Sequence, residues 1–141
     1  MKKQIILVVF LATVLLTFGF SKRQVDRWYL PSQVETGQVL FQEHCAACHG
    51  ENGEGAENWK EPLPDGTYPA PPLNGSGHSW HHSISPLKLS INAGGEPWGG
   101  VMPDFEETLS DQQIDAVIAY FQSKWTPEIY QMWIKHDGLE K

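Results

Sequence analysis

The stretch Cys45-Ala46-Ala47-Cys48-His49 places two thiols three positions apart, with an imidazole directly after the second. This Cys-x-x-Cys-His spacing is typical of covalent c-type haem attachment. Each thiol would form a thioether with one haem vinyl group, and His49 would bind the iron as an axial ligand. The motif therefore predicts one covalently attached haem c per chain, with Cys45, Cys48 and His49 as its binding residues.

A redox-active dithiol and half of a zinc site are the alternative interpretations of two cysteines at this spacing. A thioredoxin-like dithiol should follow a β-strand, whereas residues 37–41 upstream have a helical pattern. A four-thiolate zinc site needs a second cysteine pair, and the sequence contains only two cysteines. Both alternatives are therefore disfavoured.

The sequence contains two strong signals for the start of a helix. Ser32 is expected to cap a helix that runs toward the haem motif, with Glu35 completing a capping box. Ser110 and Gln113 have the same arrangement ahead of the clearest amphipathic helix. The apolar stripe of that helix recurs at helical spacing and comprises Ile114, Val117, Ile118, Phe121 and Trp125.

Weaker helical patterns lie elsewhere, and no segment shows convincing alternation of a β-strand. One helix is expected at about residues 86–91, and a short one after Thr126-Pro127, because proline suits the first helical position. Met132 falls on the apolar spacing of this short helix and is expected to pack. Glycines, prolines and acids predict a loop over residues 50–77. The prediction is an all-α fold.

The first 21 residues are typical of an export segment. A basic start precedes an apolar run over residues 5–20, whose length lies between that of a signal-peptide core and a transmembrane helix of about 20 residues. Cleavage of the segment and its retention as a membrane anchor both stay open. Either outcome predicts a haem domain outside the cytoplasm, where cysteine thiols escape the cytoplasmic reducing pool.

The length of the chain, 141 residues, allows one domain. The predicted boundaries are an export signal or anchor over residues 1–21, a linker over 22–33, a haem domain over 34–126 and a helical extension over 127–141.

The formal net charge of the chain is −7, and removal of residues 1–21 would take away two lysines and no acid. This balance argues against nucleic acid or an anionic membrane surface as a partner. Carboxylates gather in residues 51–65 and 104–107. They favour a redox protein with a basic docking patch as the partner of a monomeric chain.

The second axial ligand determines whether the iron is closed, as in electron transfer, or open to gases and peroxide. Met102 is the strongest candidate because it lies in a glycine-rich loop, precedes Pro103 and comes just before the clearest helix. The other candidates are Met132, His44, His78, His81, His82 and His136. An open sixth position is the remaining alternative.

In combination these features resemble the small single-haem class I cytochromes c of bacteria. The resemblance covers about residues 34–125. It rests on the haem motif together with Gly37, Phe41, Pro71-Pro72-Leu73-Asn74-Gly75, Val101-Met102-Pro103-Asp104-Phe105, Leu109-Ser110-Asp111 and Ala119-Tyr120-Phe121. It implies a cytochrome c fold wrapped around one haem, in which the first and last helices cross at Gly37 and Tyr120 or Phe121.

The resemblance also implies a site and a function. His49 and Met102 would be the axial ligands, and the backbone carbonyl of Pro71 would accept the ring proton of His49. The implied function is a periplasmic single-electron carrier, not an enzyme. Two alternatives stay open: a haem-bearing anchored subunit of a larger respiratory oxidoreductase, and a haem enzyme or gas-binding protein with an open sixth site.

The sequence departs from the simplest pattern of this family in three segments. They are the long acidic loop over residues 51–70, the histidine-rich segment 78–82 and the extension beyond residue 125. His78, His81 and His82 suit packing at the surface or the haem edge, or a second metal. Three tryptophans could wall the haem or belong to ordinary packing, namely Trp59, Trp80 and Trp98.

Overall fold

The computed structural model describes residues 26–140 and contains only helices, turns and loops within them. The α-helices are α2 (Pro31–His44), α3 (Ala46–His49), α4 (Ile84–Ala93), α5 (Asp111–Ser123) and α6 (Pro127–Lys135), and the 3-10 helices are η1 (Ser79–His81) and η2 (Glu96–Trp98). One isolated parallel bridge joins Tyr68 and Gly100. The predicted all-α fold is confirmed.

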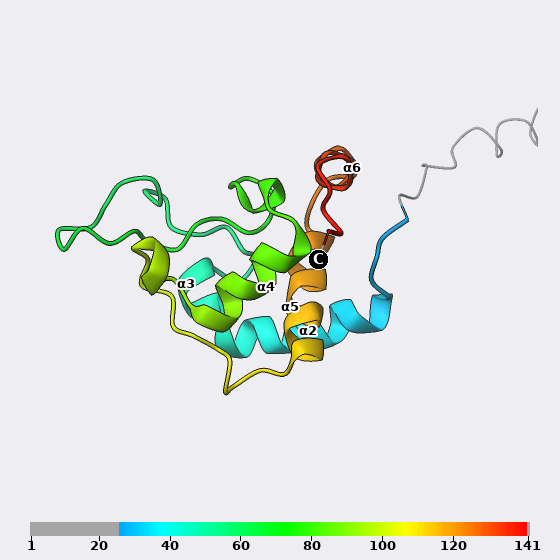
Figure 1. The fold of residues 1–141 in the computed structure, drawn as a ribbon, viewed down its shortest axis with the longest axis horizontal. Helices are drawn as coiled ribbons and strands as arrows, with labels where there is room; N and C mark the ends of the chain where they lie inside the picture. Colours follow the sequence, from blue (N-terminus) through cyan, green and yellow to red (C-terminus); the bar gives the residue numbers. More distant parts are fainter. Residues whose placement is uncertain (1–25, 141) are drawn as a thin grey trace, which may run out of the picture.

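The crossing of α2 and α5 forms the centre of the fold (Figure 1). A Cβ atom at Gly37 would overlap the backbone carbonyl of Ala116 and lie 3.0 Å from Cβ of Tyr120, so only glycine allows this approach. The rings of Phe41 and Tyr120 are buried beside it, with centroids 5.1 Å apart. The crossing implied by the family resemblance is therefore present, with Ala116 and Tyr120 as its contacts on α5.

Two further helices pack around this centre, one on α5 and one on η1. α4 packs on α5 with buried Ile84, Leu87 and Ile91, and is longer than the expected 86–91. α6, which follows α5 directly, contacts η1, and the buried Trp133 indole donates a hydrogen bond to the His82 carbonyl at 2.7 Å. The C-terminal extension is thus part of the packed structure.

The two expected capping boxes have different outcomes. The one at α5 is confirmed, because Ser110 Oγ accepts from the Gln113 amide and Gln113 Oε1 accepts from the Ser110 amide. The one at α2 is wrong by two residues. The helix begins at Pro31, and the Gln33 side chain accepts from the Leu30 amide at 2.9 Å. Proline has a φ angle suited to the first helical position, so the helix begins at Pro31 and not after Ser32.

Residues 27–30, the N-terminal strap, pack against the end of α5 and against α6. Arg27 donates to the carbonyls of Gln122 and Trp125, both at 3.1 Å, and its guanidinium lies 4.0 Å from the Tyr130 ring centroid. The Trp28 indole donates to Gln122 Oε1 at 2.7 Å. Within the predicted linker over 22–33, residues 27–30 form this strap and residues 31–33 belong to α2.

Among residues 26–140 no helix is long and apolar enough to cross a membrane. The predicted export signal or anchor lies outside the described residues.

Candidate haem-binding site

The Cys-x-x-Cys-His motif occupies the turn where α2 ends and α3 begins. The Cys45 amide donates to the Phe41 carbonyl at 2.9 Å, and the His49 amide donates to the Cys45 carbonyl at the same distance. Cys45 is half-buried, Cys48 is exposed, and both are free thiols. His49 is the buried member, with 6% of its surface exposed. The turn therefore presents two unpaired thiols next to a fixed imidazole.

The His49 ring is held by a single backbone oxygen. His49 Nδ1 lies 2.9 Å from the Pro71 carbonyl oxygen, which can only accept, so Nδ1 carries the proton. Burial lowers the pKa of His49, although the Pro71 hydrogen bond opposes this shift. The neutral ring with Nδ1 protonated leaves the Nε2 lone pair as the donor for a metal ion. This is the hydrogen bond that the family resemblance implied.

The Cys45 thiol differs from the reactive thiol of a redox dithiol. Burial raises its pKa to about 11, and the nearby Cys48 thiol adds to the shift. Redox-active Cys-x-x-Cys pairs have a lowered pKa instead, because the thiolate is the reacting form. The segment before the motif is the helix α2, not a strand. Both observations oppose the thioredoxin-like interpretation.

The Pro71 carbonyl is positioned by the loop that follows the motif. Gly55 has a φ of +69°, and a Cβ atom there would lie 2.6 Å from the Pro71 carbonyl carbon. The Gly55 amide donates to the His49 carbonyl at 2.7 Å, and the Ala56 amide donates to the Ala70 carbonyl at 2.9 Å. The start of the long loop therefore joins the His49 turn to the Pro71 segment.

Met102 lies on a loop whose backbone is fixed to the end of α4. The Gly95 amide donates to the Met102 carbonyl at 2.9 Å, and the Phe105 amide donates to the Asn92 carbonyl at 3.2 Å. A Cβ atom at Gly94 would lie 2.7 Å from the Met102 oxygen, and φ at Gly94 is +72°. Only glycine fits there, so these contacts give the methionine loop one defined path.

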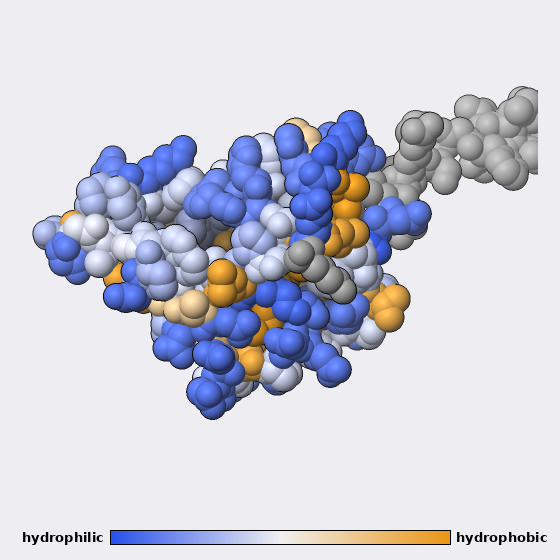
Figure 2. All heavy atoms as spheres, viewed as in Figure 1, coloured by the Kyte–Doolittle hydropathy of each residue, from blue (hydrophilic) through white to orange (hydrophobic). Residues whose placement is uncertain are grey.

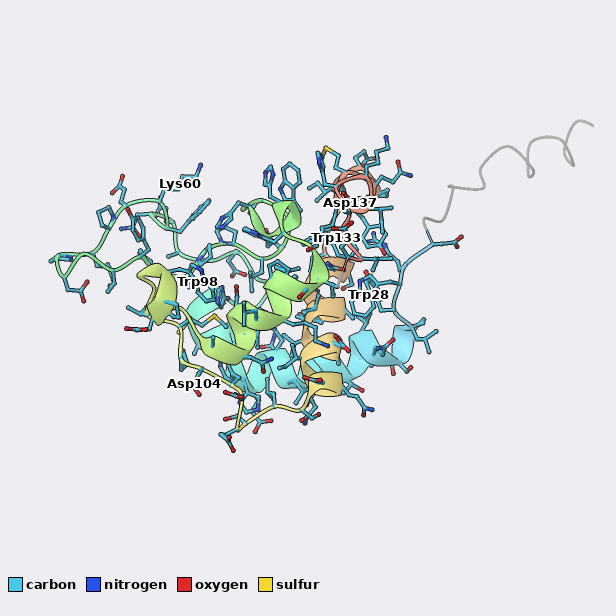
Figure 3. All side chains as sticks on the ribbon, in the orientation of Figure 1. Trp28, Lys60, Trp98, Asp104, Trp133 and Asp137 are labelled. Atoms are coloured by element: carbon cyan, nitrogen blue, oxygen red, sulfur yellow. The ribbon has the colours of Figure 1, made fainter. Side chains whose placement is uncertain are left out.

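The long loop over residues 51–70 also contacts the segment that leads to Met102. The Tyr68 amide donates to the Gly99 carbonyl at 3.1 Å, as part of the bridge to Gly100. Residues 51–70 thus contact the segments that carry both predicted ligands. In Figure 1 this loop and η2 lie at the same end of the molecule as α3, and Figure 3 labels Lys60 and Trp98 there.

The side chains present fit a covalently bound haem. Nine partly buried apolar side chains pack on the core, and four of them come from the motif and the loops around it, namely Cys45, Leu73, Trp80 and Met102. Partly exposed apolar surface of this kind suits a flat, largely apolar group. Free thiols at the attachment positions and an imidazole with an available Nε2 complete the donor set.

The other candidate ligands have different surroundings. Met132 is 39% exposed on α6, so the expectation that it packs is wrong. The His44 ring lies edge-on to Phe105, His78 stacks on Trp59 and His81 stacks on Trp80. Within the described residues no group of three or more His, Cys, Asp or Glu side chains could hold a metal. In the histidine-rich segment, two rings thus stack on tryptophans and the third, His82, lies edge-on to His78.

Sequence reasoning missed the supports of the site. Gly94 and Gly95 carry the methionine loop, a role that no pattern in the sequence indicated. Trp125 was expected only as part of an apolar stripe, yet its indole donates to the Leu73 carbonyl at 2.8 Å. The sequence did indicate part of this role, since a tryptophan expected to be buried needs a hydrogen-bond acceptor for its N–H group.

The comparisons with known proteins agree with this geometry. A family model with the description Cytochrome c matches residues 34–125, which is more than half of the chain. Comparisons with curated proteins and with solved structures gave no match.

Proposed function

The chain belongs to the cytochrome c family and binds haem c covalently in an electron-transfer role, and we propose that it is a periplasmic single-electron carrier with His49 and Met102 as axial ligands. One observation carries the proposal of a closed site. The Met102 backbone is fixed against the end of α4, and its side chain packs on the same core as Cys45. A methionine whose backbone is already fixed in this way favours an iron whose sixth coordination position is occupied by Met102.

Bound haem supplies reversible one-electron oxidation and reduction. Cys45 and Cys48 would attach it, and the Pro71 carbonyl would orient the His49 ring and raise its basicity. The Met102 thioether would favour the reduced state. Because both ligands lie on segments fixed by backbone hydrogen bonds, they can keep their positions in both oxidation states.

We expect a low-spin visible spectrum from the haem-loaded protein in both oxidation states. The oxidised form should show the weak far-red band of methionine bound to ferric iron, and carbon monoxide should leave the reduced spectrum unchanged, because Met102 occupies the sixth position. The measurement is an absorption spectrum of each state, before and after addition of carbon monoxide.

A high-spin spectrum or prompt binding of carbon monoxide would instead support the haem enzyme or gas-binding alternative. An anchored respiratory subunit would have the same spectrum as a free carrier, but would co-purify with a membrane complex.

The acidic surface supports a partner with a basic docking patch. Residues 51–65 contain five carboxylates and a single lysine. All five carboxylates are exposed, and so are those at residues 104–107. Figure 2 shows hydrophilic surface over the long loop and along the edge where Figure 3 labels Asp104. We propose that these carboxylates steer a redox partner to the end of the molecule formed by the loop over residues 51–70.

Reversal of two loop charges should slow electron transfer to a cationic oxidant. In the variant E57K/E61K we expect the rate with tris(phenanthroline)cobalt(III) to fall about tenfold at low ionic strength, because steering by local charge changes association rates by about 10- to 1000-fold. The difference should vanish at about 1 M salt, where the Debye length is about 3 Å. Stopped-flow kinetics over a salt series measures it.

The matched control is E35K/E140K, which makes the same change in net charge at exposed positions on α2 and in the C-terminal tail. It should retain most of the rate. An equal loss in both variants would mean that net charge alone matters, and would remove the docking surface from the proposal.

A further inference from the structure

We propose that Trp125 is a positioning residue for the haem ligand His49. It acts through the Leu73 carbonyl, which its indole holds, and through the Pro71 carbonyl two residues earlier, which holds the His49 ring. The proposal rests on the proposed role of His49 as an axial ligand. It assigns a function to a side chain far along the sequence from the haem motif.

The Pro71-Pro72 segment depends on its neighbour for hydrogen bonds. Proline has no backbone N–H group, so neither Pro71 nor Pro72 can donate a bond that fixes the segment. Leu73 is the first residue after them that can, and both of its backbone groups are used. Its amide donates to the Gly53 carbonyl at 2.7 Å, and its carbonyl accepts from Trp125 Nε1 at 2.8 Å. Without the indole, only one of these two bonds remains.

The Trp125 side chain is itself rigidly placed. It is 2% exposed, its ring lies 6.0 Å from the Trp133 ring, and its Cδ1 would lie 3.2 Å from a Cβ atom at Gly75. The Trp125 carbonyl accepts from Arg27. Because the Trp125 ring is held by these other contacts, its indole can restrict the position of the Leu73 carbonyl.

These contacts come from outside the family match. Arg27 belongs to the N-terminal strap and Trp133 to α6, and both lie beyond residues 34–125. Figure 3 labels Trp133 and Trp28, from these two flanking segments, in this part of the molecule. The flanking segments would thus support the His49 side of the site, where a hydrogen bond to the ring raises the basicity of the ligand.

The test compares two tryptophans that make the same kind of bond. The variant W125F loses the bond to Leu73, whereas W133F keeps an aromatic ring beside Trp125 and loses the bond from a fully buried indole to the His82 carbonyl at 2.7 Å. We expect hydrogen exchange of the His49 Nδ1 proton to become at least about tenfold faster in W125F and to stay near the original rate in W133F. Nuclear magnetic resonance of the reduced, haem-loaded protein measures this exchange.

The reduction potential gives a second readout. A looser Pro71 bond makes the His49 ring a weaker electron donor, so the potential should rise in W125F and not in W133F. Replacing the Trp125 indole by benzothiophene removes only the N–H group. This replacement decides the question if W125F does not fold, and it should accelerate exchange as W125F does.

Three results would overturn the proposal: unchanged exchange after loss of the Trp125 N–H group, equal acceleration in W133F, or acceleration that follows global stability alone. Failure of the proposed function gives a different result. In that case the unaltered protein would lack the large haem-induced shifts of the His49 ring signals.

Discussion

Replacement of Met102 by alanine is expected to open the iron to carbon monoxide. Alanine has no donor atom, so the sixth position would be left to water or an added ligand. The reduced variant should bind carbon monoxide promptly, and its oxidised form should lose the far-red band. The reduction potential should fall by a few hundred mV, since axial ligands move haem potentials over about 0.8 V in total. Absorption titration and redox potentiometry measure both effects.

Met132→Ala is the matched control, because Met132 is the other methionine among the described residues and is partly exposed on α6. It should behave as the unaltered protein does. The assignment of Met102 as the sixth ligand fails if reduced M102A does not bind carbon monoxide. If only M132A binds it, Met132 is the sixth ligand instead.

Replacement of Gly37 by alanine should produce the largest loss of stability. The new methyl group would overlap the Ala116 carbonyl, and a backbone group inside a helix cannot rotate away as a side chain can. Overpacking of this kind costs about 1–3 kcal/mol, or more where nothing yields. The gain in helix propensity from glycine to alanine offsets about 1 kcal/mol. We expect a net loss of about 2 kcal/mol and a melting temperature lower by about 10 °C, measured by thermal and denaturant unfolding of the haem-loaded protein.

Gln38→Ala is the control on the same helix, because Gln38 is exposed and such substitutions usually change stability by less than about 0.5 kcal/mol. If G37A were as stable as Q38A, α2 and α5 could separate without cost, and the crossing would not be a rigid point of the fold.

Local signals in the sequence predicted much of the fold. The capping box at Ser110 fixed the start of α5, and the stripe from Ile114 became its buried face. Thr126-Pro127 correctly placed the start of α6. These features depend on neighbours within one or two turns, so periodicity and capping chemistry are sufficient to find them.

The parts that were missed depend on contacts distant in sequence. Trp125 and Leu73 are 52 positions apart, and Arg27 and Trp125 are 98 apart. No local pattern encodes such pairs. The same limit applies to residues 27–30, which have no helical pattern of their own and pack against α5 and α6. For the site, the Cys-x-x-Cys-His motif was sufficient to predict how haem is attached. The glycines that support the Met102 loop were not predictable, because they act through the close approach of two backbone segments.

The N-terminal strap would also limit the length of a tether if the predicted export segment were retained in a membrane. The strap begins at Arg27, at the end of the molecule opposite the long loop (Figure 1), and only five residues separate it from the end of the predicted export segment at residue 21. Fully extended, five residues span about 17 Å. If the segment is retained in the membrane, the domain stays within about that distance of the bilayer. The strap side would then lie nearer the lipid than the acidic loop over residues 51–70, which is at the opposite end of the molecule.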